Sequence, residues 1–144
     1  MTPELLRSVP GGPELIQWFG YAPRFHDAEV LGLTLDREEP RCSLRVHGFE
    51  MTSEIDSAGY FICAKHATVT FDLIDLTALE IADFNGQNAL MGLTIERGLD
   101  GGFRLELDPA YGLSGTIEAR RLEISFEPGI PAGSQYLKLA QMAR

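Results

Sequence analysis

The sequence predicts a mainly β fold of the α+β class: an antiparallel sheet or sandwich of about seven strands, with a short N-terminal helix and optionally a short C-terminal helix. Apolar and polar residues alternate in several short segments, as half-buried strands require. The 15 Gly and 8 Pro supply many turns, and no segment keeps a helical period for long. A chain of 144 residues is large enough for its own core, so residues 1–144 are predicted to form a single domain.

The N-terminal part contains one helical pattern, GGPELIQWFGY at residues 11–21. Leu15, Trp18 and Phe19 fall on one face of this helix, and Gly20 suits its end. We therefore expect a short helix that covers one side of a sheet, with Trp18 in a packing role rather than as a binding anchor.

The first predicted strand begins at Glu29, where the apolar period changes to two. Leu31, Leu33 and Leu35 alternate with polar or small residues and are expected to be buried. A turn-rich stretch at 36–41 joins this strand to the next one in a predicted hairpin. The further predicted strands are residues 42–51, 66–76, 77–84, 88–97, 102–108 and 114–127.

Two stretches have weaker patterns. Residues 52–66 are predicted as an exposed excursion or as another short strand. The tail after Pro131 contains Ser134 as a helix cap and suggests a brief helix. The phenylalanines within strand patterns are expected in the core: Phe71, Phe84, Phe103 and Phe126.

The charge balance excludes some partners. With 21 acidic and 12 basic residues the net charge is −9, and the bases are scattered along the chain. Nucleic acid and anionic membranes would be repelled, so neither is expected as a partner. A basic partner protein would instead be attracted, because complementary fields accelerate encounters.

The two cysteines and the chain start indicate the compartment. Cys42 and Cys63 have no CxxC or zinc-type spacing, so both are predicted to be reduced. The sequence shows neither an export signal nor an apolar run long enough for a membrane span. We therefore expect a cytoplasmic protein.

The stretch RFHDAEVLGLTLDR, residues 24–37, contains the best polar cluster, His26, Asp27 and Glu29. An imidazole beside carboxylates is able to perform acid–base chemistry, but neighbours in a strand point to opposite faces. The alternative, which we favour, is that Asp27 fixes the turn by bonding backbone amides. His26 and Glu29 remain candidates for a surface site.

Signatures of catalysis, metal binding and cofactor binding are missing from the sequence. There is no GxSxG, phosphate loop or HExxH, and His47 and His66 would approach the cluster only through the tertiary fold. We expect no cofactor, no metal and no catalytic residue.

Two further groups of residues are candidates for structure or recognition. Asn85, Gln87 and Asn88 form an amide-rich junction that either bridges strands, which we favour, or lines a recognition surface. An acidic and aromatic set is a candidate interface, with the solvated side of a sheet as its alternative. That set is Glu50, Glu54, Asp56, Tyr60, Phe61 and Tyr111.

Three segments taken in order carry a resemblance to a known family: Trp18 followed by FHDAEVLGLTLDR, then ADFNGQNALMGLTIER, then LELDPAYGLSGTIEARRLEIS. Together they resemble the bacterial immunity protein fifty family, small cytosolic β-rich proteins inferred to neutralise toxins of polymorphic toxin systems. The resemblance covers roughly residues 14–127. Its characteristic residues match Trp18, His26, Asp27, Glu29, Phe84, Asn85 and Asn88.

Three hypotheses follow. The resemblance implies a non-enzymatic protein that binds and neutralises a cognate toxin domain. A small enzyme or ligand-binding module that uses His26, Asp27 and Glu29 in a pocket is the rival hypothesis. A homo-oligomer formed through exposed edge strands is a third alternative.

Overall fold

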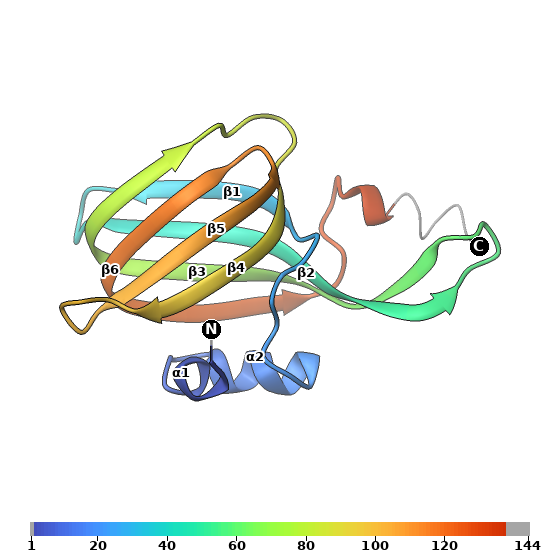
Figure 1. Cartoon of the computed structure of the whole chain (residues 1–144), viewed down its shortest axis with the longest axis horizontal. Helices are drawn as coiled ribbons and strands as arrows, with labels where there is room; N and C mark the ends of the chain where they lie inside the picture. Colours follow the sequence, from blue (N-terminus) through green and yellow to red (C-terminus); the bar gives the residue numbers. More distant parts are fainter. Residues whose placement is uncertain (1, 138–144) are drawn as a thin grey trace.

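The computed structural model describes residues 2–137 and shows six antiparallel strands closed into one barrel (Figure 1). The order around the barrel is β1-β2-β3-β6-β5-β4. The strands are β1 (Glu29–Asp36), β2 (Arg41–Ile55), β3 (Phe61–Ala82), β4 (Ala89–Arg97), β5 (Phe103–Tyr111) and β6 (Ser114–Pro128). The predicted β class is thus confirmed, with the sheet closed on itself.

The barrel consists of two three-stranded meanders, β1-β2-β3 and β4-β5-β6. They join along a long β3–β6 pairing that runs from Ala67 opposite Pro128 to Ala82 opposite Ser114. At the other side, β1 and β4 meet only near Glu29 and Ala89. One junction of the barrel is therefore extensive and the other, called the seam below, is short.

Two helices, α1 (Pro3–Arg7) and α2 (Gly12–Phe19), lie beside β6, below the barrel in Figure 1. The predicted helix corresponds to α2, which ends at Gly20, and its Leu15 and Phe19 are buried. The link between the helices is held by the amide of Ile124, which donates to the carbonyl of Pro10 at 2.8 Å. Apolar side chains of the helices thereby complete the core. Helix α1 was not predicted.

The structure has six strands instead of seven because residues 66–76 and 77–84 are not separate. Residues 66–82 all belong to β3, which continues through a register shift between Leu76 and Ala78. Asp75 has a left-handed backbone, φ 61°, at this irregularity. A bulge of this kind bends a strand without ending its pairing. The predicted boundary between residues 76 and 77 is thus a kink within one strand.

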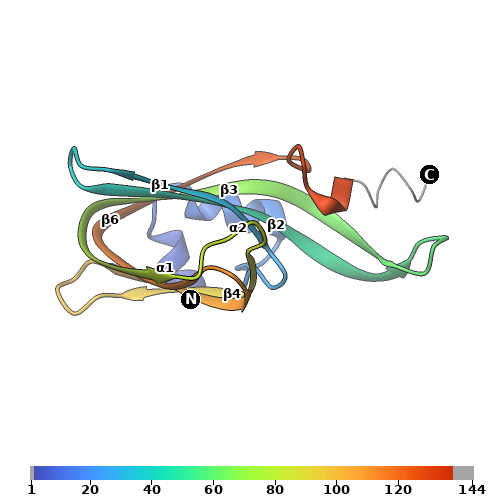
Figure 2. The same ribbon diagram turned by 90° about the horizontal axis from the view of Figure 1, so that it is seen from above.

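The weakly patterned residues 52–66 form most of a projecting hairpin. Strands β2 and β3 continue pairing beyond the barrel, from Glu50 opposite Ala64 to Ile55 opposite Phe61. This extension, residues 50–64, is called the arm; Figure 2 shows it reaching away from the barrel at the end opposite the β1–β2 turn. It is an exposed excursion, one of the two predicted outcomes, and it is built from extensions of β2 and β3 and not from another strand.

Two predicted core residues are in fact exposed, so those predictions were wrong. Leu35 is 53% exposed although its cross-strand partner Cys42 is buried, because β1 has β4 as a neighbour only at its other end. Phe84 is 57% exposed since it lies in the connection after β3 ends. Phe71 is fully buried, as predicted.

The predicted C-terminal helix is described only at its start. The amide of Tyr136 bonds the hydroxyl of Ser134, which therefore caps a helical turn at residues 135–137. The rest of the predicted segment lies outside the described residues. Among residues 2–137, no helix is long and apolar enough to cross a membrane.

Candidate functional site

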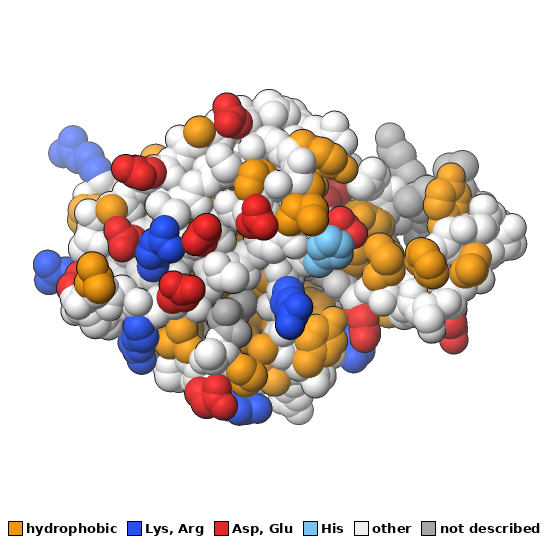
Figure 3. Space-filling view, viewed as in Figure 1, with side chains coloured by type: hydrophobic (Ala, Val, Ile, Leu, Met, Phe, Trp, Pro, Cys, Tyr) orange, Lys and Arg blue, Asp and Glu red, His pale blue; other side chains and the backbone are white. Residues whose placement is uncertain are grey.

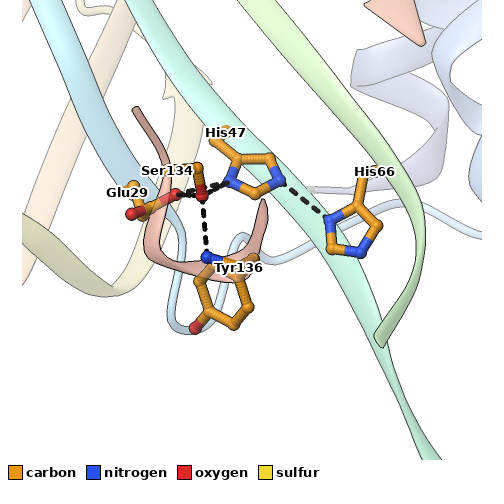
Figure 4. A network of polar contacts seen from close by, with 5 residues as sticks. All are labelled: Glu29, His47, His66, Ser134 and Tyr136. Atoms are coloured by element: carbon orange, nitrogen blue, oxygen red, sulfur yellow. Dashed lines mark hydrogen bonds and ion pairs between the residues drawn. The ribbon is translucent and has the colours of Figure 1, made fainter. Parts of the chain in front are cut away.

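The main polar cluster of the structure lies where the arm leaves the barrel (Figure 4). Glu29 begins β1 and stands directly opposite His47 of β2 in the antiparallel register. Directly opposed residues share a face of the sheet, so their side chains meet. His66 comes from β3 and Ser134 from the segment after β6.

Hydrogen bonds join these four side chains into one continuous network. Oε1 of Glu29 lies 2.6 Å from Nδ1 of His47 and 2.5 Å from Oγ of Ser134, and both groups donate to it. Nε2 of His47 lies 2.9 Å from Nδ1 of His66. When His47 is neutral its proton is on Nδ1, so Nε2 accepts and Nδ1 of His66 donates. The carboxylate thereby sets the tautomers of both imidazoles.

Aromatic rings cover this cluster. The ring of Tyr136 lies 4.4 Å from that of Phe49 and 5.6 Å from that of His47, between ring centres. The rings of His47 and His66 are stacked 5.1 Å apart. The cluster therefore ties the chain after β6 to the root of the arm.

The surroundings shift three pKa values. Burial alone would raise the pKa of Glu29, but hydrogen bonds from His47 and Ser134 and the charge of His47 outweigh it, so that this pKa is lowered. Burial, aided by the charge of His47, lowers the pKa of His66. Burial, with nearby negative groups, raises the pKa of Tyr136 to about 12.

The cluster is better suited to holding strands together than to turnover. His47 is fully buried and Ser134 is 3% exposed. The Ser134 hydroxyl donates to Glu29, and its Oγ is 3.4 Å from Nδ1 of His47, the nitrogen that itself donates to Glu29. A serine nucleophile needs a free base and access to substrate, and this hydroxyl has neither.

His26 and Asp27 lie apart from this cluster, in the turn before β1. Nδ1 of His26 donates to the carbonyl of Met91 at 3.0 Å, and its Nε2 lies 3.5 Å from Asp27. Asp27 has a left-handed backbone, φ 63°. Within residues 2–137 its carboxylate bonds no backbone amide, whereas its own amide donates to the carbonyl of Leu90 at 2.8 Å. Asp27 therefore shapes the turn through its backbone.

A cleft of about 240 Å³ opens beside these two residues. Its walls include Tyr21, Phe49 and Met51, so it adjoins the root of the arm. Glu29 is not among its lining residues, and in the described chain no bond joins Glu29 to His26 or Asp27. The predicted polar cluster is thus divided: Glu29 faces His47, and the other two residues face the cleft.

The FHDAE segment and the amide junction meet at the seam. The amide of Leu90 donates to the carbonyl of Ala28 at 3.0 Å, and the amide of Val30 donates to the carbonyl of Asn88 at 2.9 Å. These two backbone bonds, together with the bonds from His26 to Met91 and from Asp27 to Leu90, close the barrel. Two motifs some sixty residues apart in the sequence therefore form one structural junction.

Asn88 is the centre of the amide junction and is 8% exposed. Its Oδ1 accepts from the amides of Leu113 and Asn85, at 2.9 and 3.1 Å, and its Nδ2 donates to the carbonyl of Asn85 at 2.6 Å. Asn88 thereby links the loop between β3 and β4 to the turn between β5 and β6. These bonds agree with the favoured strand-bridging interpretation.

Two other motif residues differ in their surroundings. Nε1 of Trp18 donates to the carbonyl of Lys65 at 3.0 Å, and its ring lies 6.0 Å from that of Phe126. Trp18 thus packs against the barrel and fastens the root of the arm. Phe84 remains exposed beside the amide junction.

The candidate interface residues divide into two groups. All of them except Tyr111 lie on the arm, whereas Tyr111 ends β5 next to Ala89 at the seam. His47, His66 and Ser134 were not predicted as a site. The position of His47 could have been predicted to within one residue. Pairing β1 with β2 residue by residue, starting from their turn, places His47 next to the position opposite Glu29, because the observed register shifts only once between the turn and this pair. Ser134 lies 105 residues from Glu29 and gave no local signal.

Comparison with known proteins gave one match. The family model described as Immunity protein 50 matches residues 12–126, which include α2 and almost all of the barrel. Neither the curated proteins nor the solved structures include a significant match.

Proposed function

Because the chain belongs to the Immunity protein 50 family, we propose that it is a non-enzymatic immunity protein that binds and neutralises a cognate toxin domain in the cytoplasm of its own cell. The family match is the observation that carries this proposal. It extends over more than three-quarters of the chain, residues 12–126 of 144, so it concerns the barrel as a whole.

The site geometry supports binding over catalysis. In the Glu29–His47–His66–Ser134 cluster, His47 and Ser134 are buried, and the four side chains hydrogen-bond to one another. Such a network fixes neighbouring elements in one arrangement. A protein that occludes a partner gains from rigidity, because fewer groups must be ordered on binding.

The charge supports a protein partner. A net charge of −9 favours encounter with a basic domain. A domain that acts on nucleic acid would carry such a basic surface.

The proposal is tested by co-expression with the product of the neighbouring open reading frame, scored by cell survival and by co-elution from a size-exclusion column. Survival together with a stable complex is the expected result. Leu99→Thr provides a control variant, since Leu99 lies fully exposed in the β4–β5 turn and should protect as well as the original chain. A toxic neighbour that this protein neither binds nor counteracts would refute the proposal and direct attention to ligands of the cleft beside His26.

A further inference from the structure

In the part of the chain that the structure describes, the arm is a two-stranded hairpin with two open edges. Strand β1 accompanies β2 only as far as His47, and β6 accompanies β3 only as far as Ala67. Beyond these points, within residues 2–137, the strand ladders pair β2 and β3 only with each other. An isolated hairpin is marginally stable in water, so an extended one needs a reason to persist.

Large apolar side chains cover the arm. Exposed fractions range from 37% for Ile62 to 60% for Ile55. Figure 3 shows apolar side chains following the arm from its root to its tip. The residues are Met51, Ile55, Tyr60, Phe61 and Ile62. Exposed apolar side chains of this number and size on one projecting element are typical of an interaction surface.

The charges of the arm have one sign. Residues 50–64 contain Glu50, Glu54 and Asp56 and no Lys or Arg. The nearest cation along the chain, Lys65, is already engaged by the carbonyl of Phe19 at 2.9 Å and by Glu50 at 3.6 Å. Two arms brought together would repel each other, and so would an arm and a phosphate backbone. The charge pattern therefore favours a cationic protein surface over a second copy of this chain.

The tip and the root of the arm are both ordered by specific bonds. Oδ1 of Asp56 accepts from the amides of Ala58 and Tyr60, at 2.9 and 3.0 Å, and Gly59 supplies the left-handed residue of the turn. At the root, the carbonyl of Lys65 accepts from Trp18, and His66 belongs to the buried cluster. The apolar patch is thus presented in a fixed conformation, which lowers the entropic cost of docking.

From these observations we propose that the arm is the docking element of this protein. Its occupant is a toxin domain with an apolar groove bordered by lysines and arginines. The groove buries the side chains of Ile55 and Phe61, while Glu54 faces its basic border. This inference rests on the proposed function and names the binding surface and the class of partner.

The test uses the purified toxin domain encoded beside the gene, inactivated by mutation, and measures its affinity by biolayer interferometry. Ile55 and Phe61 are cross-strand partners, so the double variant Ile55→Thr/Phe61→Thr removes one apolar pair while placing threonine, a residue that favours strands, at both positions. Its affinity should fall at least 30-fold, which is about 2 kcal/mol, the usual threshold of a binding hot spot. Leu99→Thr is the matched control, because Leu99 lies in the β4–β5 turn, away from the arm in Figure 1, and this variant should bind as the original chain does.

A second variant tests the charge. Glu54→Lys should slow association several-fold and weaken its dependence on salt, while dissociation changes little. Thermal unfolding and size-exclusion chromatography verify that each variant stays folded.

The outcomes separate the two proposals. Unchanged affinity of the folded double variant would overturn the arm as docking element and leave the toxin-binding function intact. Absence of binding by the original chain would overturn both. A dimer of the original chain that the double variant converts to a monomer, with toxin affinity unchanged, would assign the arm to a second copy instead.

Discussion

Nδ1 of His47 lies 2.6 Å from Oε1 of Glu29, and this contact joins β1 to β2 at the point where the arm leaves the barrel. Glu29 is the partner that orients a fully buried imidazole. Removing Glu29 takes away the hydrogen-bond acceptor of His47 Nδ1 and that of the Ser134 hydroxyl.

The variant Glu29→Ala should therefore lower the free energy of unfolding by about 2–4 kcal/mol, somewhat less than for a wholly enclosed pair, because Glu29 keeps some solvent contact. Urea denaturation provides the measurement. Glu106→Ala is the control, since the Arg104–Glu106 pair is solvent-exposed and should change stability by less than about 0.5 kcal/mol. Equal losses in the two variants would contradict the structural importance of the cluster.

Stability should fall in two separate steps on acidification. The pKa of His66 is lowered from 6.5, so the unfolded chain takes up this proton first, and stability declines as pH falls below 6.5. The pKa of Glu29 is lowered from 4.5, so its contribution is present above pH 4.5 and declines below that value. Urea midpoints at pH 7.5, 5.5 and 4 follow both steps.

The variant His66→Gln isolates the first step. It should have nearly the same stability at pH 7.5 and 5.5, and it should retain the loss below pH 4.5. A first step of undiminished size in this variant would show that another group titrates there.

Asn88→Ala should be costly because Asn88 serves three backbone groups from a nearly buried position. The amide of Leu113 would remain buried without its acceptor, at an expected cost of about 2–3 kcal/mol. Thermal unfolding provides the measurement. Asn85→Ala is the matched control: its exposed side chain caps the amide of Gln87 locally, and its loss should cost about 1 kcal/mol or less.

Two glycines with similar backbone angles allow the cost of a left-handed backbone to be distinguished from the cost of a steric clash. Gly112 has φ 79°, and a Cβ there would lie 2.3 Å from Oδ1 of Asn88. Gly59 has φ 87° in the arm turn, with nothing within 4 Å of a Cβ. Gly59→Ala should thus cost only the left-handed strain, about 1 kcal/mol, and Gly112→Ala markedly more. Equal costs in thermal unfolding would show that the junction around Asn88 adjusts easily.

Local patterns in the sequence predicted much of the fold. The alternating leucines placed β1 and its hairpin with β2, and the apolar face of residues 15–19 placed α2. The kink at Asp75 was misread as a boundary because a bulge and a turn use similar residues. Closure of the sheet depends on how distant strands pair, and no single segment encodes that.

The candidate site was predicted less completely. Glu29 was identified, but its partners come from β2, β3 and the chain after β6, so their convergence is a property of the barrel. The bridging interpretation fits Asn88, whose side chain reaches the amide of Leu113, whereas the side chain of Asn85 bonds only backbone groups of its own loop. Whether the arm residues form an interface stays a prediction until a partner is tested.

The short seam also has a kinetic consequence. Each meander forms from neighbouring strands, but pairing β1 with β4 must close a loop of about sixty residues, for only a few bonds in return. The seam should therefore form late in folding, and it should be the first part of the native barrel to open. In hydrogen-exchange measurements, the amides of Val30 and Leu90 should exchange through local opening of the seam. The amides of Val69 and Phe71, in the β3–β6 ladder, should exchange only through global unfolding.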